Sequence, residues 1–211
     1  MSKTSVQKHT KSGFTTLGIA ITAVLIALST LLTMFTKIPV PGIRGYFNVG
    51  DAVIMLAALL LGRKEGTLVG AIGPALADLL LGYAVFVPIT FLVKGIEGFL
   101  VATVYGKKKS FSSALLATLI GGAIIVIGYF VAESFVFDFG VASAGILTNT
   151  TQAVMSVLIS MLLYTALRKI PFIANVDPLK KAQYRSLEDL TDPIKVVIYM
   201  GGHEELVDEI V

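Results

Sequence analysis

The sequence predicts an all-α integral membrane protein with six transmembrane helices. Hydrophobic residues make up 55% of the 211-residue chain and charged residues only 15%, and the mean hydropathy is +0.84. Three uncharged runs, 14–36, 110–132 and 139–167, are long enough to cross a bilayer, because about 20 helical residues span its apolar core. The apolar segment between the first two runs is interrupted by charges and turn residues, which predict three shorter helices.

The individual helices follow from these interruptions. The run 14–36 comes after a basic segment, but it is longer than the apolar region of a signal peptide and lacks a clear cleavage site, so it is expected to stay as the first span. Asp51, the GRKEG turn at 62–66 and the sequence GYAVFVP at 82–88 divide the middle segment. The helices predicted there are 48–62, 66–82 and 87–105. The run 139–167 is expected to include a loop before its helix.

Basic residues predict the orientation of the bundle. One set of loops and ends carries ten lysines and arginines, whereas the opposite set carries only Lys37 and Arg44. The larger set comprises Lys3, Lys8, Lys11, Arg63, Lys64, Lys107, Lys108, Lys109, Arg168 and Lys169. Because basic residues near span ends stay in the cytoplasm, both termini are expected there. The expected domains are a cytoplasmic N-terminal segment, a six-helix membrane domain and an acidic cytoplasmic tail, at 1–13, 14–170 and 171–211.

Catalytic and metal-binding motifs are not found in the sequence. The chain has no cysteine, and its two histidines, His9 and His203, are far apart in the sequence, so a thiolate or histidine metal centre is not expected. It contains no GxxxxGK[ST] phosphate loop, no GxSxG elbow and no HExxH motif. We therefore expect no catalytic residue, no cofactor and no ATP hydrolysis by this chain itself.

Charged residues within the predicted spans are the main functional signal. The segment VPITFLVKGIEGFLVA, at 87–102, has the composition of a membrane helix except for Lys94 and Glu97, and each charge costs about 2.5–3.5 kcal/mol on insertion scales. At a spacing of three residues the two can neutralise each other, so a structural ion pair and a ligand-binding role both remain open. Asp78 either binds a ligand or bonds to a neighbouring helix or to Lys94. Asp51 is expected mainly to cap the second helix.

Most polar residues within the spans fall in their outer halves, given a helical rise of about 1.5 Å per residue. This distribution favours a ligand pocket that opens to the outside above a sealed inner half. Tyr46 lies in an outer loop that is either an ordinary connection or a lid with an aromatic face. The candidate ligand-binding residues are Tyr46, Asn48, Asp78, Tyr83, Lys94, Glu97, Tyr129, Glu133, Asn149 and Gln152. They suit a small neutral or weakly basic heteroaromatic ring with hydroxymethyl groups.

One long block of the sequence resembles a known family. The block GYFNVGDAVIMLAALLLGRKEGTLVGAIGPALADLLLGYAVFVPITFLVKGIEG, with Ala23 and Ala27 in an AxxxA pattern, resembles the substrate-binding S components of energy-coupling factor (ECF) vitamin transporters. The resemblance covers about 14–170 and is strongest to the branch that handles pyridoxine or the hydroxymethylpyrimidine moiety of thiamin. It implies vitamin capture at the outer face of the bacterial cytoplasmic membrane. It also implies docking, through Ala23 and Ala27, to a transmembrane coupling protein joined to two ATPases.

A second function from another class remains open at the level of the sequence. The chain could be an autonomous secondary transporter of a small polar solute, with Asp78, Lys94 and Glu97 as a proton relay. Inverted repeats would support that function, but the two halves of the sequence show no convincing similarity. The first hypothesis requires partner ATPases for uptake, and the second requires only an ion gradient.

Overall fold

In the part of the chain that the structure describes, the fold is a bundle of six helices with one very short pair of strands. The computed structural model describes residues 16–39, 46–106 and 109–168. The elements are α1 (Thr16–Phe35), β1 (Ile38–Pro39), β2 (Tyr46–Phe47), α2 (Asp51–Leu60), α3 (Arg63–Leu80), α4 (Val87–Tyr105), α5 (Phe111–Val136) and α6 (Phe139–Leu167). The predicted all-helical fold is thus confirmed, although the antiparallel pairing of β1 with β2 was not predicted. The predicted segments 1–13 and 171–211 lie outside the described residues.

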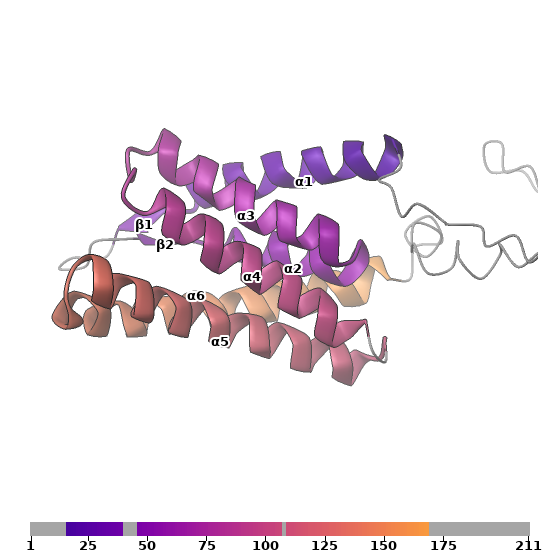
Figure 1. Ribbon diagram of the computed structural model, residues 1–211. Helices are drawn as coiled ribbons and strands as arrows, with labels where there is room; N and C mark the ends of the chain where they lie inside the picture. The colour runs from indigo at the N-terminus through magenta and orange to yellow at the C-terminus, as the bar shows by residue number, and fades with distance from the viewer. Residues whose placement is uncertain (1–15, 40–45, 107–108, 169–211) are drawn as a thin grey trace, which may run out of the picture.

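Successive helices pass back and forth between the two ends of the bundle. One end holds the strands, the α3–α4 turn and the α5–α6 turn, and the other holds the α2–α3 junction and the last turns of α4 and α6 (Figure 1). Helix α2 lies in the centre and contacts all five other helices, whereas α1 lies at the periphery and packs mainly on α3. The short α2 therefore forms the core around which the longer helices assemble.

The surface of the bundle is apolar, as expected for a protein solvated by lipid. Among the described residues, four helices have the length and composition to cross a membrane, namely α1, α4, α5 and α6, and α2 is a shorter apolar helix. In helix α1 the distribution of side chains is the reverse of that in a soluble protein. The apolar Leu28 and Leu31 are exposed, while the polar Thr30 and Thr33 are buried against neighbouring helices. Lipid solvates the apolar side chains. The Thr30 hydroxyl is satisfied within the bundle by donating to the carbonyl oxygen of Gly73, whereas the Thr33 hydroxyl has no hydrogen-bond partner among the described residues.

Glycines bring α3 and α4 into close contact. A methyl group at Gly70 would overlap the backbone carbonyl of Lys94, and one at Gly98 would overlap the carbonyl of Gly66. Each helix thus places a glycine against the backbone of the other. Small residues at a helix interface allow this approach in membranes, where close packing rather than exclusion of water drives association.

Several predicted boundaries were wrong, and two of them are explained by a residue at a helix end. Helix α2 is shorter than the predicted 48–62 at both ends. Helix α3 begins at Arg63, not after a turn ending near residue 66, because Gly62 alone makes the turn with a φ of +107°. Helix α6 begins directly at Phe139 without a preceding loop, since the Asp138 side chain accepts a hydrogen bond from the Val141 amide at 2.9 Å. Helix α5 extends to Val136, four residues beyond the prediction.

Candidate ligand-binding site

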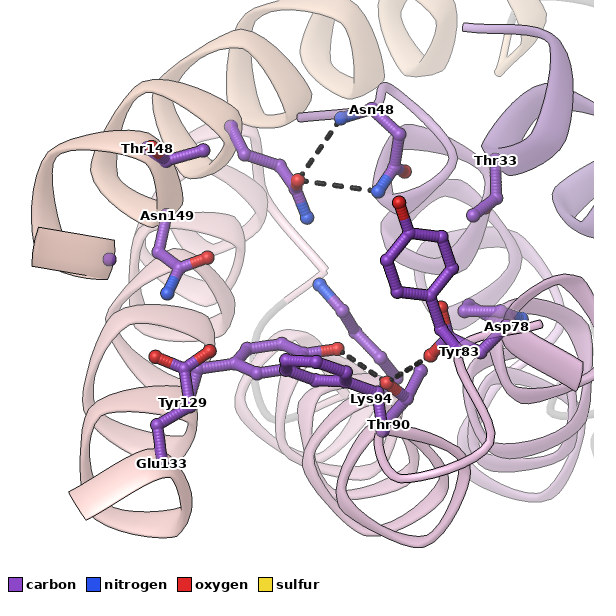
Figure 2. Close-up of a pocket in the computed structure, with 14 residues that line it drawn as sticks. Thr33, Asn48, Asp78, Tyr83, Thr90, Lys94, Tyr129, Glu133, Thr148 and Asn149 are labelled. Atoms are coloured by element: carbon purple, nitrogen blue, oxygen red, sulfur yellow. Dashed lines mark hydrogen bonds between the residues drawn. The ribbon is translucent and has the colours of Figure 1, made fainter. Parts of the chain in front are cut away.

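A polar pocket lies at the end of the bundle that carries the strands. Its walls come from the last turns of α1 and α3, the α3–α4 turn, and the adjoining turns of α4, α5 and α6, with Asn48 from the segment before α2 (Figure 2). The lining residues are Thr33, Asn48, Pro74, Asp78, Tyr83, Phe86, Thr90, Lys94, Tyr129, Glu133, Gly145, Thr148, Asn149 and Gln152. Segments that are far apart in the sequence therefore form one pocket.

A buried network of polar side chains forms one part of the pocket wall. The Lys94 ammonium donates to Asp51 Oδ2 at 2.6 Å, and the Gln152 amide nitrogen donates to the same oxygen at 2.6 Å. Gln152 Oε1 in turn accepts from the backbone amide and the side-chain amide of Asn48, at 3.1 and 3.3 Å. The network joins α2, α4 and α6 through fully buried groups, so it orients Lys94 and Gln152 relative to the pocket.

The role predicted for Asp51 was wrong. Helix α2 begins at Asp51 itself, and the residue in the N-cap position is Gly50, which makes no side-chain capping bond. The Asp51 carboxylate instead pairs with Lys94 from α4. The predicted pair of Lys94 with Glu97 is present, but at 3.7 Å it is longer than the bond from Lys94 to Asp51. Lys94 therefore sits between two buried carboxylates, and its charge is compensated by protein groups.

A second set of hydrogen bonds connects α3, α4 and α5. The Thr90 hydroxyl donates to Asp78 Oδ2 at 2.5 Å, and its oxygen lies 2.9 Å from the Tyr129 hydroxyl. Figure 2 shows Thr90 between the other two side chains. The Tyr129 ring also lies near the Lys94 ammonium, with 5.3 Å between the nitrogen and the ring centroid. Asp78 is thus bonded to a neighbouring helix, one of the possibilities that its sequence left open.

Eight of the ten candidate ligand-binding residues are brought together around this pocket. They are Asn48, Asp78, Tyr83, Lys94, Tyr129, Glu133, Asn149 and Gln152. Glu97 is fully buried one turn further along α4, behind the lining residues, where it faces Lys94. Tyr46 is part of β2, and its side chain lies outside what the structure describes. A ligand-binding role for each of these residues remains a prediction.

Several lining residues were not predicted from the sequence, notably Thr33, Phe86 and Thr90. Threonines are common in membrane helices and usually bond to a carbonyl of their own helix, as Thr22 does with Gly18. Thr90 could have been predicted from its position in the sequence, because it lies one turn before Lys94 and therefore on the same face of α4. No comparable signal marked Thr33.

The fold and this pocket define the chain as a helical multi-pass membrane protein with a polar pocket inside the bundle. A family model described as ECF-type riboflavin transporter, S component, matches residues 13–169. The chain therefore belongs to the family of ECF-type transporter S components, which are substrate-binding membrane subunits and not enzymes. The predicted resemblance is confirmed at the level of the family.

Three known proteins illustrate this similarity. An uncharacterised protein of Pyrococcus woesei is 36% identical over 130 residues, which cover 62% of this chain and 87% of that protein. The thiamine precursor transporter HmpT of Lactococcus lactis is 26% identical over 142 residues, covering 67% of this chain and 81% of HmpT. A solved S component of a bacterial ECF transporter has a similar fold, with a TM-score of 0.62 and 21% identity over 71% of this chain and 94% of the other.

Proposed function

We propose that this chain captures a small heteroaromatic vitamin or vitamin precursor, of the pyridoxine or hydroxymethylpyrimidine type, for an ECF importer. The observation that supports this most directly is the pocket itself, in which aromatic, amide and carboxylate side chains converge at one end of the bundle. The opposite end carries Arg63, Lys64 and Arg168, which favours a cytoplasmic location for that end. The pocket then opens to the outside of the membrane, and both termini lie in the cytoplasm.

The charges of the lining favour a neutral or weakly basic ligand. Lys94 is the one cationic side chain among the described lining residues, and Asp51 and Glu97 already compensate it. A phosphorylated ligand would need several cationic donors. Tyr83, Phe86 and Tyr129 offer ring faces for stacking, and the amides of Asn149 and Gln152 suit hydroxyl groups. The name of HmpT, a relative over two thirds of this chain, supports a thiamine precursor as one such ligand.

Calorimetric titration of the purified protein with a panel of vitamins tests this proposal. We expect pyridoxine or hydroxymethylpyrimidine to bind far more tightly than pyridoxal phosphate or folate. Asp78→Asn should weaken binding at least tenfold, about 1.4 kcal/mol, because the amide oxygen can still accept from Thr90 but the charge and the second acceptor oxygen that the carboxylate offers a ligand are lost. The panel includes riboflavin, which the family description names. Tight binding of riboflavin, folate or a phosphorylated vitamin alone, or unchanged affinity in Asp78→Asn, would contradict this ligand class.

We propose that the partners are a transmembrane coupling protein and two ATPases, with Ala23 and Ala27 of α1 as the docking face. Both alanines are exposed on the outer face of α1, one turn apart, and the larger Val24 and Leu28 flank them. Small side chains at this spacing let the backbone of another helix approach closely. An autonomous secondary transporter would not need such a face, and family membership also favours the binding subunit.

Replacing both Ala23 and Ala27 with leucine is expected to abolish uptake and co-purification with the coupling protein. Ligand binding by the isolated protein should stay unchanged, because both alanines are on the exposed face of the middle of α1, whereas α1 contributes to the pocket through the buried Thr33 of its last turn. Ala144→Leu is a matched control, since Ala144 is exposed on α6 and lies outside the proposed docking face. Uptake that persists in the double variant would refute the docking assignment. Ion-gradient-driven uptake in a host without coupling proteins would instead support the secondary transporter.

A further inference from the structure

Glu133 is a buried acidic residue of the pocket wall whose carboxylate is not fully satisfied by the described protein groups. Its side chain comes from the last turns of α5, lines the pocket and is only 6% exposed. Its Oε2 atom has no hydrogen-bond partner among the described residues. A buried carboxylate oxygen without a donor is costly, so the site is incomplete as it stands.

A glycine of α6 makes room for this carboxylate. A methyl group at Gly145 of α6 would lie 2.8 Å from Glu133 Oε2 and 3.5 Å from the Asn149 amide nitrogen. Figure 2 shows the Glu133 carboxylate directed toward the Asn149 side chain. Glu133 and Asn149 thus flank a part of the pocket where α6 presents only backbone.

The other acidic groups nearby differ from Glu133 in their surroundings. Asp78 accepts a hydrogen bond from Thr90, and Asp51 is paired with Lys94. Glu97 also lacks a hydrogen bond among the described groups, but it faces Lys94 and is not a lining residue. Lys94 is paired with Asp51 and Glu97, and among the described residues no ion pair joins it to Glu133. The missing donor is therefore one that a ligand can supply.

We propose that Glu133 is the specificity-determining residue of the pocket and receives an amino-substituted ring edge of the ligand. This inference rests on the proposed function, since it requires that a heteroaromatic ligand enters the pocket. An amino group next to a protonated ring nitrogen offers two parallel N–H donors, which match the two oxygens of a carboxylate. Tyr129 is one turn before Glu133 and shares its face of α5, so a ring stacked on Tyr129 directs its edge toward Glu133.

The preferred ligand is therefore an aminopyrimidine rather than a pyridoxine-type ring. Pyridoxine carries hydroxyl groups and no ring amino group, so it gives Glu133 a weaker, single donor. A ring with a keto oxygen in place of the amino group turns an acceptor toward the carboxylate and is disfavoured. Rejection of such an analogue is strong when it leaves a buried polar group unpaired.

The test compares two ligands in matched variants of the full-length protein. The probes are amino-substituted hydroxymethylpyrimidine and the analogue in which a keto oxygen replaces the ring amino group, both titrated by calorimetry. The unaltered protein should prefer the amino compound at least tenfold. Glu133→Gln should weaken binding of the amino compound at least tenfold and leave the keto analogue unchanged or improved, because the glutamine amide can donate to the keto oxygen. Glu65→Gln is the control for loss of a carboxylate, because Glu65 is in the first turn of α3, at the end of the bundle opposite the pocket.

The outcomes separate this inference from the proposed function. If the unaltered protein binds neither pyrimidine nor pyridoxine, the proposed function fails. If it binds both pyrimidines equally, or if Glu133→Gln weakens both alike, the assignment of Glu133 is overturned while the proposed function stands. If Glu133→Gln does not fold, the comparison uses the unaltered protein and Glu133→Asp, which keeps the charge. Both should prefer the amino compound over the keto analogue, and a lack of this preference overturns the assignment of Glu133.

Discussion

Replacing Lys94 with methionine is expected to destabilise the whole bundle and to weaken ligand binding by at least tenfold. The Lys94 ammonium lies 2.6 Å from Asp51 Oδ2 and 3.7 Å from Glu97 Oε2, and all three residues are no more than 1% exposed. The variant leaves two carboxylates buried without a cation. Removing one partner from a buried ion pair costs about 3–5 kcal/mol, a large part of the stability of an ordinary domain.

Thermal unfolding of the detergent-purified protein, followed by circular dichroism, measures this loss. The matched control is the triple variant Asp51→Asn, Lys94→Met and Glu97→Gln, which removes all three charges while nearly keeping the side-chain shapes. It should recover most of the stability lost in Lys94→Met, because the methionine no longer faces uncompensated carboxylates. A Lys94→Met variant that unfolds at the same temperature as the unaltered protein would contradict the role of the cluster.

Gly98→Ala is expected to have the second-largest effect, although it adds a single methyl group. That methyl would overlap the backbone carbonyl of Gly66, and a backbone cannot move aside as a flexible side chain can. Helices α3 and α4 must then separate, which also displaces Asp78 and Thr90 at the pocket end of the same two helices. Overpacking of this kind costs about 1–3 kcal/mol and occasionally more.

Gly95→Ala provides a control on the same helix face. Its added methyl would lie 3.2 Å from the Ala71 side chain, a tight contact that small shifts can relieve. We expect a clearly lower unfolding temperature for Gly98→Ala and a small change for Gly95→Ala in parallel thermal scans. Equal effects of the two substitutions would show that close backbone contact does not limit the α3–α4 interface.

Features within one helix were predictable from the sequence, because helical spacing determines which residues share a face. The pairing of Lys94 with Glu97 is of this kind, at a spacing of three residues. The long apolar runs, together with the charges and turn residues that divide the segment between them, likewise predicted six helices close to those observed. Errors at the ends arose where one residue, such as Gly62 or Asp138, determined the boundary.

Contacts between helices were not predictable, because no periodic pattern relates residues on different spans. Lys94 and Asp51 are 43 residues apart, and Gln152 and Asp51 are 101 apart. The sequence near Asp51, with Asn48 and Gly50 before it, is typical of a helix start and favoured the wrong role. Thr90 was missed for a similar reason, since only the packing of α3 against α4 places its hydroxyl on Asp78.

The short central helix has a consequence for how the protein enters the membrane. With ten residues, α2 is about 15 Å long, half of the roughly 30 Å apolar core of a bilayer, and nine of those residues are buried in the protein. It therefore cannot be retained in lipid by itself as a span. Its first residue, Asp51, is neutralised by Lys94, which the ribosome adds 43 residues later. The position of α2 in the bilayer therefore depends on its packing with α3 and α4, so that in this part of the chain membrane insertion and tertiary folding are coupled.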